Sequence, residues 1–189
     1  MPSAHRVAPR WAAAVTSLLI ALAVALAGCG LGTTTDSGMP SGTGAYLFGV
    51  QSKTTGCKVN GPLQDQACTP GAIFPDATVS QICTPGYASS VRSVSTSLKN
   101  KVYASYGITT HYTGQYEVDH LVSLELGGSN DISNLWPEAA NPTPGFHQKD
   151  QVENYLHDQV CEGKVPLKQA QIAIATNWLA VYNTMPSGG

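Results

Sequence analysis

One apolar run at the N-terminus decides how much of this chain is available to fold. A basic segment with Arg6 and Arg10 precedes the run, which covers residues 11–27 and ends in small residues before Gly28. A basic start, an apolar centre and small residues before a cleavage point describe an export signal, which is removed from the mature protein. At about 17 residues the run is also at the short limit for a membrane span. Removal of residues 1–28 leaves 161 of the 189 residues, enough for one domain.

The end of this signal predicts a lipid anchor. The residues Leu26-Ala-Gly-Cys29 resemble the bacterial lipobox, in which the cysteine is lipidated and becomes the first residue of the mature chain. A plain signal peptide that ends in a cysteine by chance is the alternative. Residues 30–45 are rich in Gly, Ser and Thr and predict a flexible tether. We therefore expect a domain over residues 46–183, held at the extracytoplasmic side of the cell membrane by Cys29, and a disordered tail over 184–189.

Charge limits the possible partners. Charged residues make up 12% of the chain, about half the usual share, with Lys+Arg 10 against Asp+Glu 12. Removal of the signal takes Arg6 and Arg10, so the mature net charge is about −4. A polybasic coat for DNA or for membranes is excluded, because such binding depends on many phosphate contacts. A protein that contacts only a few phosphates is not excluded.

The four cysteines beyond Cys29 predict disulfides. An even number in an exported chain favours two bonds, and three connectivities are compatible with the sequence. We predict Cys57–Cys68, which closes a local loop, and Cys83–Cys161, which joins the two halves of the domain. A structural zinc site is the alternative, although the chain has no Cys-x-x-Cys pair.

Periodicity predicts an α+β domain with few strands. Apolar residues at every third or fourth position favour helices over residues 93–106, 146–161 and 167–182. Alternation favours a strand over residues 116–122, and a short extended segment covers 134–136. Gly127-Gly128 marks a turn between these strands, and residues 138–145 form a loop before the next helix. We expect Trp136 to anchor the core.

The segment that carries chemistry is Tyr116-Glu-Val-Asp-His-Leu-Val-Ser-Leu-Glu-Leu-Gly-Gly-Ser-Asn-Asp-Ile-Ser-Asn-Leu-Trp-Pro-Glu138, followed by Phe146-His-Gln-Lys-Asp-Gln-Val-Glu-Asn154. It resembles the HNH nuclease superfamily, whose core is a ββα-metal hairpin and helix. It is most similar to HNH-like domains of exported actinobacterial proteins. Those domains carry a similar Cys-Thr-Pro-Gly stretch, then Asp-His-Leu, Leu-Glu-Leu-Gly-Gly, Asn-Leu-Trp-Pro-Glu and Lys-Asp-x-x-Glu. The resemblance covers about residues 68–178.

This resemblance implies roles for particular residues. His120 is the expected general base, since an imidazole can take a proton from water at neutral pH. Asp119 and His147 are the implied ligands of a divalent ion, with Mg²⁺ preferred and Mn²⁺, Zn²⁺ or Ni²⁺ as alternatives. Asn134 is expected either to hold the loop or to orient the His120 ring. Adjacent residues of a strand point to opposite faces, so Asp119 and His120 can serve different roles.

The third ligand is left open by the sequence. The gap between Asn134 and His147 is longer than in many HNH nucleases, and no zinc-binding cysteine pair lies nearby. On a helix, His147 and Asp150 share a face, so either is a candidate ligand. Lys149 and Glu153 are expected to support the site. Alternatively, the helix residues form a solvated face and Asp119-His120 is a polar pair at a strand edge.

These observations lead to one leading hypothesis and one rival. The first is a metal-dependent HNH-type endonuclease that hydrolyses phosphodiester bonds of nucleic acid, with DNA preferred over RNA. The second is a non-catalytic envelope lipoprotein that uses an HNH-like scaffold to bind a partner. Open coordination around converging Asp119 and His120 favours the enzyme, whereas a filled pocket favours the scaffold. The sequence indicates no particular protein partner.

Overall fold

The structure of the chain is a computed structural model, and it describes residues 46–186. The predicted signal peptide, the lipidation site at Cys29, the tether and residues 187–189 lie outside the described residues. None of the described helices is both long enough and apolar enough to cross a membrane.

A two-stranded antiparallel hairpin lies at the centre of the domain. Strand β1 (Tyr116–His120) pairs with β2 (Leu135–Ala139), with Asp119 opposite Trp136 and His120 opposite Leu135. The first strand is shorter than predicted, because the chain turns after His120. The second begins one residue later and continues into the predicted loop, through Pro137. Proline is tolerated here because β2 has a free edge in a sheet of two strands.

The loop between the strands contains two short 3₁₀ helices, η1 (Leu124–Leu126) and η2 (Ile132–Asn134). The predicted Gly-Gly turn follows η1. Gly127 adopts a left-handed conformation at φ 74°, and its N–H caps η1 on the Leu124 carbonyl. At Gly128 the requirement is space, because an added Cβ would lie 1.8 Å from the Val122 carbonyl oxygen. The chain therefore folds back on itself at a point where only glycine fits.

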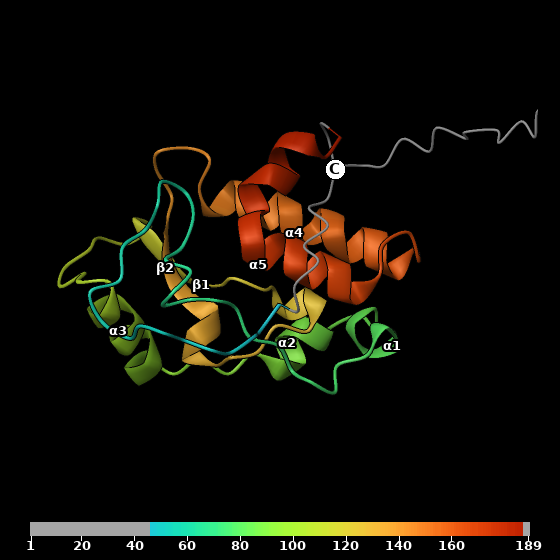
Figure 1. The fold of residues 1–189 in the computed structure, drawn as a ribbon, viewed down its shortest axis with the longest axis horizontal. Coiled ribbons are helices and arrows are strands. Elements are labelled where there is room, and N and C mark those ends of the chain that lie inside the picture. The colour runs from blue at the N-terminus through green and yellow to red at the C-terminus, as the bar shows by residue number, and fades with distance from the viewer. Residues whose placement is uncertain (1–45, 187–189) are drawn as a thin grey trace, which may run out of the picture. The chain divides into compact units, whose positions relative to one another are not determined.

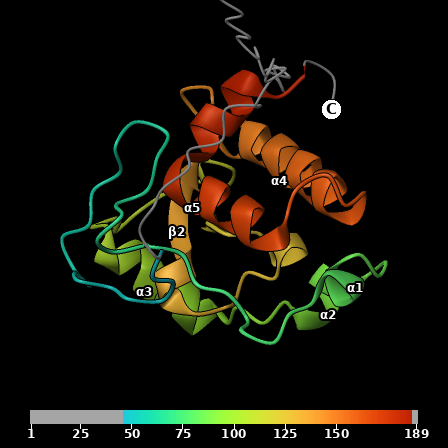
Figure 2. The same cartoon turned by 45° about the vertical axis from the view of Figure 1, so that its right-hand side comes forward.

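Two long helices cover one side of the hairpin (Figures 1 and 2). Helix α4 (Phe146–Cys161) has the predicted bounds. It begins at Gly145, whose N–H donates to Gln148 Oε1 at 2.8 Å. Helix α5 (Leu167–Thr184) runs slightly past the predicted end and bends at Asn177, whose Oδ1 caps the second segment by accepting from Ala180 N. Met185 packs on the core, so the folded chain extends beyond residue 183.

Three smaller helices complete the domain. Helix α3 (Thr96–Ser105) is shorter than predicted because Ser95 caps its start by accepting a hydrogen bond from Leu98 N. It lies on the opposite side of the hairpin from α4 and α5 (Figures 1 and 2). Helices α1 (Val79–Ile82) and α2 (Tyr87–Val91) flank the Cys83-Thr-Pro-Gly86 turn. The result confirms a small α+β domain.

The hydrophobic core has two parts because the hairpin separates them. The larger part lies between the hairpin loop, α4 and α5, and contains Leu121, Trp136, Val152, Leu156, Ile174 and Trp178. The smaller part lies under α3 and contains Val102, Val118 and Leu135. Trp136 is thus a core residue, as predicted. Each face of the hairpin is fixed by its own apolar layer.

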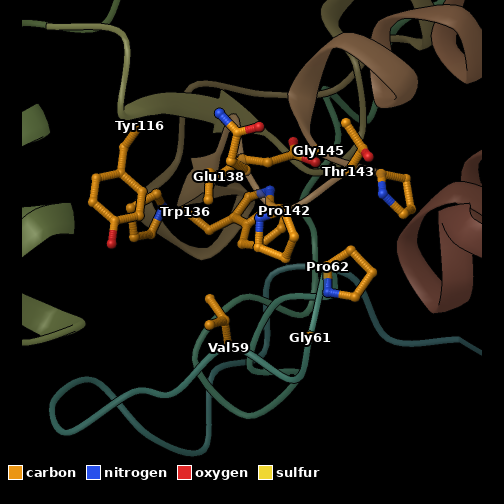
Figure 3. Close-up of a pocket in the computed structure, with 13 residues that line it drawn as sticks. Val59, Gly61, Pro62, Tyr116, Trp136, Glu138, Pro142, Thr143 and Gly145 are labelled. Carbon is orange, nitrogen blue, oxygen red and sulfur yellow. The ribbon is translucent and has the colours of Figure 1, made fainter.

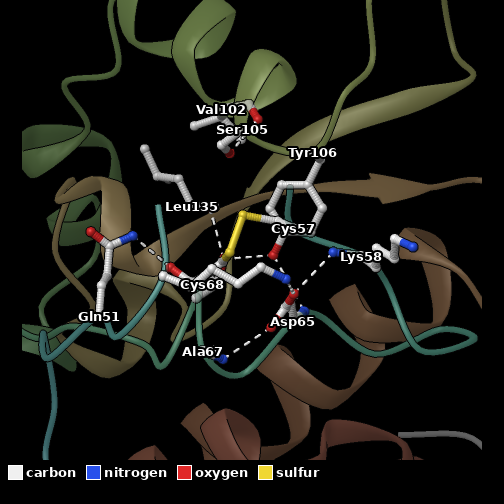
Figure 4. The surroundings of a disulfide bond; sticks show 12 residues. Gln51, Cys57, Lys58, Asp65, Ala67, Cys68, Val102, Ser105, Tyr106 and Leu135 are labelled. Carbon is white, nitrogen blue, oxygen red and sulfur yellow. Dashed lines mark hydrogen bonds and ion pairs between the residues drawn. A yellow bond between two sulfur atoms is a disulfide. The ribbon is translucent and has the colours of Figure 1, made fainter. Parts of the chain in front are cut away.

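Both predicted disulfides are present. Cys57–Cys68 closes the N-terminal loop, with a Cα–Cα distance of 6.0 Å. Figure 4 shows it below the end of α3, where Cys57 N donates to the Ser105 carbonyl at 2.9 Å. Cys83–Cys161 joins the end of α1 to the end of α4 across 78 residues. The first disulfide therefore closes the N-terminal loop on itself, and the second ties the segment before α3 to the end of α4.

Candidate active site

Asp119 and His120 end strand β1 and reach different elements. The Asp119 carboxylate contacts Lys149 on α4. The His120 ring contacts Asn130 in the hairpin loop. This arrangement follows from the alternation of side chains along a strand. The side chains of the two residues therefore make their hydrogen bonds to different elements.

Lys149 is the centre of the contacts on the α4 side. Its side chain is 1% exposed. The Nζ atom donates to Asp119 Oδ2 at 2.6 Å, to the His120 carbonyl at 2.8 Å and, at short range, to Glu153 Oε1. Burial alone would lower the pKa of Lys149, but the neighbouring carboxylates offset that effect and raise its pKa. Lys149 is therefore a buried ammonium that ties α4 to the end of β1.

Two more carboxyl groups surround this ammonium. Burial raises the pKa of Glu153 to about 7, against the opposing charge of Lys149. Glu138 is 1% exposed, and burial raises its pKa well above the ordinary range. Neither oxygen of Glu138 has a hydrogen-bond donor within residues 46–186. A proton on Glu138 lets it donate to Asp119, and this hydrogen bond favours the neutral form further.

His120 is 2% exposed and is held from the loop side. Its Nε2 lies 3.1 Å from Asn130 Oδ1. Asn130 Nδ2 in turn donates to the Val91 carbonyl at the end of α2. Burial lowers the pKa of His120, and the hydrogen bond to Asn130 opposes that effect. The ring is therefore neutral at neutral pH, which a general base requires.

Asn134 organises the loop, and its side-chain hydrogen bonds go to Ala72, Val122 and Ser129. Its Oδ1 accepts from Val122 N at 2.9 Å and from Ala72 N at 3.1 Å. Its Nδ2 donates to the Val122 and Ser129 carbonyls at 3.0 and 2.8 Å. The sequence left open whether Asn134 holds the loop or orients the His120 ring. These contacts show that it holds the loop. The residue that contacts the His120 ring is Asn130.

His147 and Asp150 lie on the exposed face of α4. His147 packs on the neighbouring Phe146 ring, with centroids 4.4 Å apart. Burial and the charge of Asp119 raise the pKa of Asp150, and the same causes raise that of Glu117 on β1. An acidic group therefore lies beside Lys149 and consists of Glu117, Asp119 and Asp150. The lysine itself is buried and is not accessible to solvent.

The residues at Asp119 do not fit a divalent ion in this arrangement. Asp119, His147 and Asp150 are not brought within ligand distance of one another; in residues 46–186 that geometry occurs at Cys83, His157 and Cys161. The sulfurs of those cysteines form a disulfide and offer no thiolate. At Asp119, the ammonium of Lys149 already binds Oδ2 and places a positive charge beside the carboxylate. The geometry at Asp119 therefore supports no catalytic step through a metal.

A separate cavity of about 270 Å³ lies beside β2. Figure 3 shows Val59, Gly61 and Pro62 of the N-terminal loop across from Trp136 and Pro142. Its lining also includes Glu138, so the buried carboxyl of the Lys149 cluster stands at its wall. The Trp136 indole N–H has no acceptor within the described residues. The cavity is mainly apolar, and His120 is not among its lining residues.

The sequence does not single out two of these residues. Asn130 stands in a polar loop, although its spacing of ten residues from His120 spans a hairpin turn that returns to the strand end. Glu138 falls in the predicted loop after Pro137, where burial is not expected. Lys149 is predicted to support the site, but its full burial is not. Its position four residues before Glu153 and three before the buried Val152 is the available signal.

Comparisons with known proteins give no relative, since no family model, curated protein or solved structure matches the chain.

Proposed function

We propose that this domain is an HNH-type endonuclease that hydrolyses phosphodiester bonds of nucleic acid, held at the outer face of the cell membrane by lipidated Cys29. The observation that carries the proposal is the end of β1, where a neutral His120 is fixed by Asn130 in a strand–loop–strand–helix unit. This unit has the order of elements that the resemblance implied. DNA is the preferred substrate.

In the proposed reaction, His120 takes a proton from a water molecule. The water oxygen then forms a bond to phosphorus, and the bond from phosphorus to the leaving oxygen breaks. The leaving oxygen takes a proton from solvent, and His120 returns its proton to solvent. Asn130 fixes the His120 ring, and thereby which ring nitrogen faces the water. The charge of Arg92, which is exposed, acts on His120, so Arg92 is the candidate contact for a phosphate oxygen. Substrate must approach from the α2 side, because α4 covers the other face.

A second candidate is a non-catalytic envelope lipoprotein that binds a partner. Two observations favour it. Lys149 already pairs with Asp119, the residue that the resemblance implied as an ion ligand. His120 is 2% exposed, which restricts access to its ring. In this case the hairpin supports a binding surface and performs no chemistry.

A nuclease assay on the disulfide-intact protein separates the two candidates. Plasmid, single-stranded DNA and RNA are incubated with Mg²⁺, Mn²⁺, Zn²⁺ or Ni²⁺ and, in parallel, with EDTA. His120→Ala is expected to reduce the cleavage rate by about 10²–10⁴-fold, the usual contribution of a general base. His111→Ala, at an exposed position, is the matched control and should cleave normally. Cleavage that is absent, or equal in the His120→Ala protein, rejects the hydrolase and favours the binding module.

A further inference from the structure

We infer that the ammonium of Lys149 is the resident cation of an internal site formed by Asp119, Glu138, Glu153 and the His120 carbonyl, so that this domain holds no divalent ion at Asp119. The inference does not depend on the proposed hydrolysis. It concerns which cation occupies the junction between β1 and α4, and it applies equally to an enzyme and to a binding module.

The coordination of Lys149 is complete. An ammonium has three protons, and Nζ has three acceptors: Asp119 Oδ2, the His120 carbonyl and Glu153 Oε1. Two of them come from consecutive residues of β1, and the third lies one turn further along α4. A buried ammonium costs a large desolvation free energy unless its donors are all bonded. Here every proton is used, so the lysine is held in place.

Three acidic residues surround the single ammonium of Lys149. Asp119 and Glu153 bond to it, and Glu138 is close enough for their charges to act on one another. Removal of the ammonium alone would leave these acids buried without a cation. With Lys149 between them, the oxygens of these acids are not within metal-ligand distance of one another. Hard divalent ions such as Mn²⁺ and Mg²⁺ are the ions that carboxylate oxygens favour once the lysine is removed. In the parent protein the cation of the cluster is therefore Lys149.

Lys149 disfavours a divalent ion at this site. An ion that bound Asp119 Oδ2 would have to displace the lysine, and an ion at either carboxylate oxygen would stand beside a second positive charge. Lys149 itself is 1% exposed, so its ammonium does not reach a phosphate. It is a positioning residue that fixes the Asp119 carboxylate and the backbone of His120. No activity of this domain should accordingly depend on a divalent ion bound at Asp119.

Manganese binding tests the inference directly. The disulfide-intact protein is titrated with Mn²⁺ by calorimetry and by electron paramagnetic resonance, and its thermal midpoint is recorded with Mn²⁺ and with EDTA. We expect no stoichiometric binding and no shift of the midpoint. Lys149→Ala is expected to gain one Mn²⁺ site, at least 10-fold tighter than any binding to the parent protein, and a higher midpoint with Mn²⁺. Lys164→Ala, which removes an exposed lysine paired with Glu162, should gain nothing.

Each outcome decides the inference. One equivalent of Mn²⁺ bound by the parent protein and lost in Asp119→Asn would overturn it. So would a folded Lys149→Ala protein that binds no Mn²⁺, because the acids would then not form a cation site. If Lys149→Ala is unfolded without ions, folding on addition of Mn²⁺ supports the inference and failure to fold rejects it. None of these readouts requires nuclease activity.

Discussion

The Nζ atom of Lys149 lies 2.6 Å from Oδ2 of Asp119, across 30 residues of sequence. This contact joins the first turn of α4 to the end of β1, and Glu153 and the His120 carbonyl complete it. It makes the Asp-His segment part of a buried ionic junction. The stability of the hairpin and its chemistry are therefore coupled through one lysine.

Replacement of this lysine should be costly. Lys149→Met is expected to lower the free energy of unfolding by about 3–5 kcal/mol, because removal of one partner leaves buried carboxylates uncompensated. Urea denaturation of the two proteins at pH 7 measures the difference. Lys164→Met is the control and should unfold like the parent, since its ion pair with Glu162 is exposed. Equal stability of all three proteins would contradict the buried junction.

The raised pKa of Glu138 predicts that the stability of the folded protein depends on pH. This pKa is raised in the folded protein, so the folded state binds more protons than the unfolded state above the ordinary glutamate pKa. This contribution to stability is present at low pH and is lost as the pH rises toward the folded-state value. Glu138→Gln resembles the neutral form and should keep its stability. The stability of the variant relative to the parent should therefore increase from pH 5 to pH 8.

Denaturation curves at both pH values check this. A constant difference between the parent and Glu138→Gln would mean that Glu138 does not titrate in this range. Glu125→Gln, at a half-buried position on η1, is the matched control for the loss of a carboxyl group.

Asn134 should tolerate neither a small nor an isosteric replacement. Asn134→Ala removes four hydrogen bonds, each worth about 0.5–1.5 kcal/mol. Asn134→Asp keeps the shape, but an ionised aspartate cannot donate to the Val122 and Ser129 carbonyls. Both variants are expected to lose at least about 2 kcal/mol in urea denaturation. A stable Asn134→Asp protein at pH 7 would show that the amide donors are dispensable.

Asn130 should affect the reaction through His120. The hydrogen bond that His120 Nε2 donates to Asn130 Oδ1 opposes the lowering of the His120 pKa by burial, so Asn130→Ala should lower that pKa further. A general base works when neutral, and its rate falls as the pH drops through its pKa. The acid limb of the pH–rate profile should therefore move to lower pH, with a smaller maximal rate because the ring is less well fixed. A smaller rate with no movement of the limb would indicate a structural effect alone.

The two disulfides should differ in their contribution to stability. Their loops span 11 and 78 residues, and loop-closure entropy predicts about 2.8 kcal/mol for Cys57–Cys68 against about 4.5 kcal/mol for Cys83–Cys161. Paired Cys→Ala variants, compared by denaturation, measure both values. A larger loss from the short loop would show that local hydrogen bonds, such as those that the Asp65 carboxylate accepts from Lys58 N and Ala67 N inside this loop, matter more than chain entropy.

The sequence predicts the main helices and the hairpin because these rest on apolar periodicity. Helix α4 is predicted to the residue, since Val152, Leu156 and Val160 form one stripe. Both disulfides are also predicted, because compartment and cysteine number restrict the choices. Apolar periodicity is a local property of the sequence, and the number of cysteines can be counted directly from it.

The contacts of the site are less predictable because they depend on where distant segments meet. Asn130 and Asn134 are both loop asparagines, and only the path of the loop decides which one reaches His120. Lys149 looks solvated beside Asp150, and its burial depends on the angle at which α4 crosses the end of β1. The extension of β2 past Pro137, which buries Glu138, is hidden in the sequence because proline usually ends a strand.

The tight fold at Gly128 has a consequence for variation in this domain. Its φ is not in the left-handed region, so conformation alone would admit many residues there; the Val122 carbonyl oxygen, 1.8 Å from an added Cβ, is what excludes them. Gly145 is similar, with the Ala139 oxygen 2.3 Å from such an atom. A saturation library should thus return glycine alone at both positions, while Gly56 and Gly163, which face open space, accept asparagine. The two intolerant positions bracket β2, the segment that carries Trp136 and Glu138.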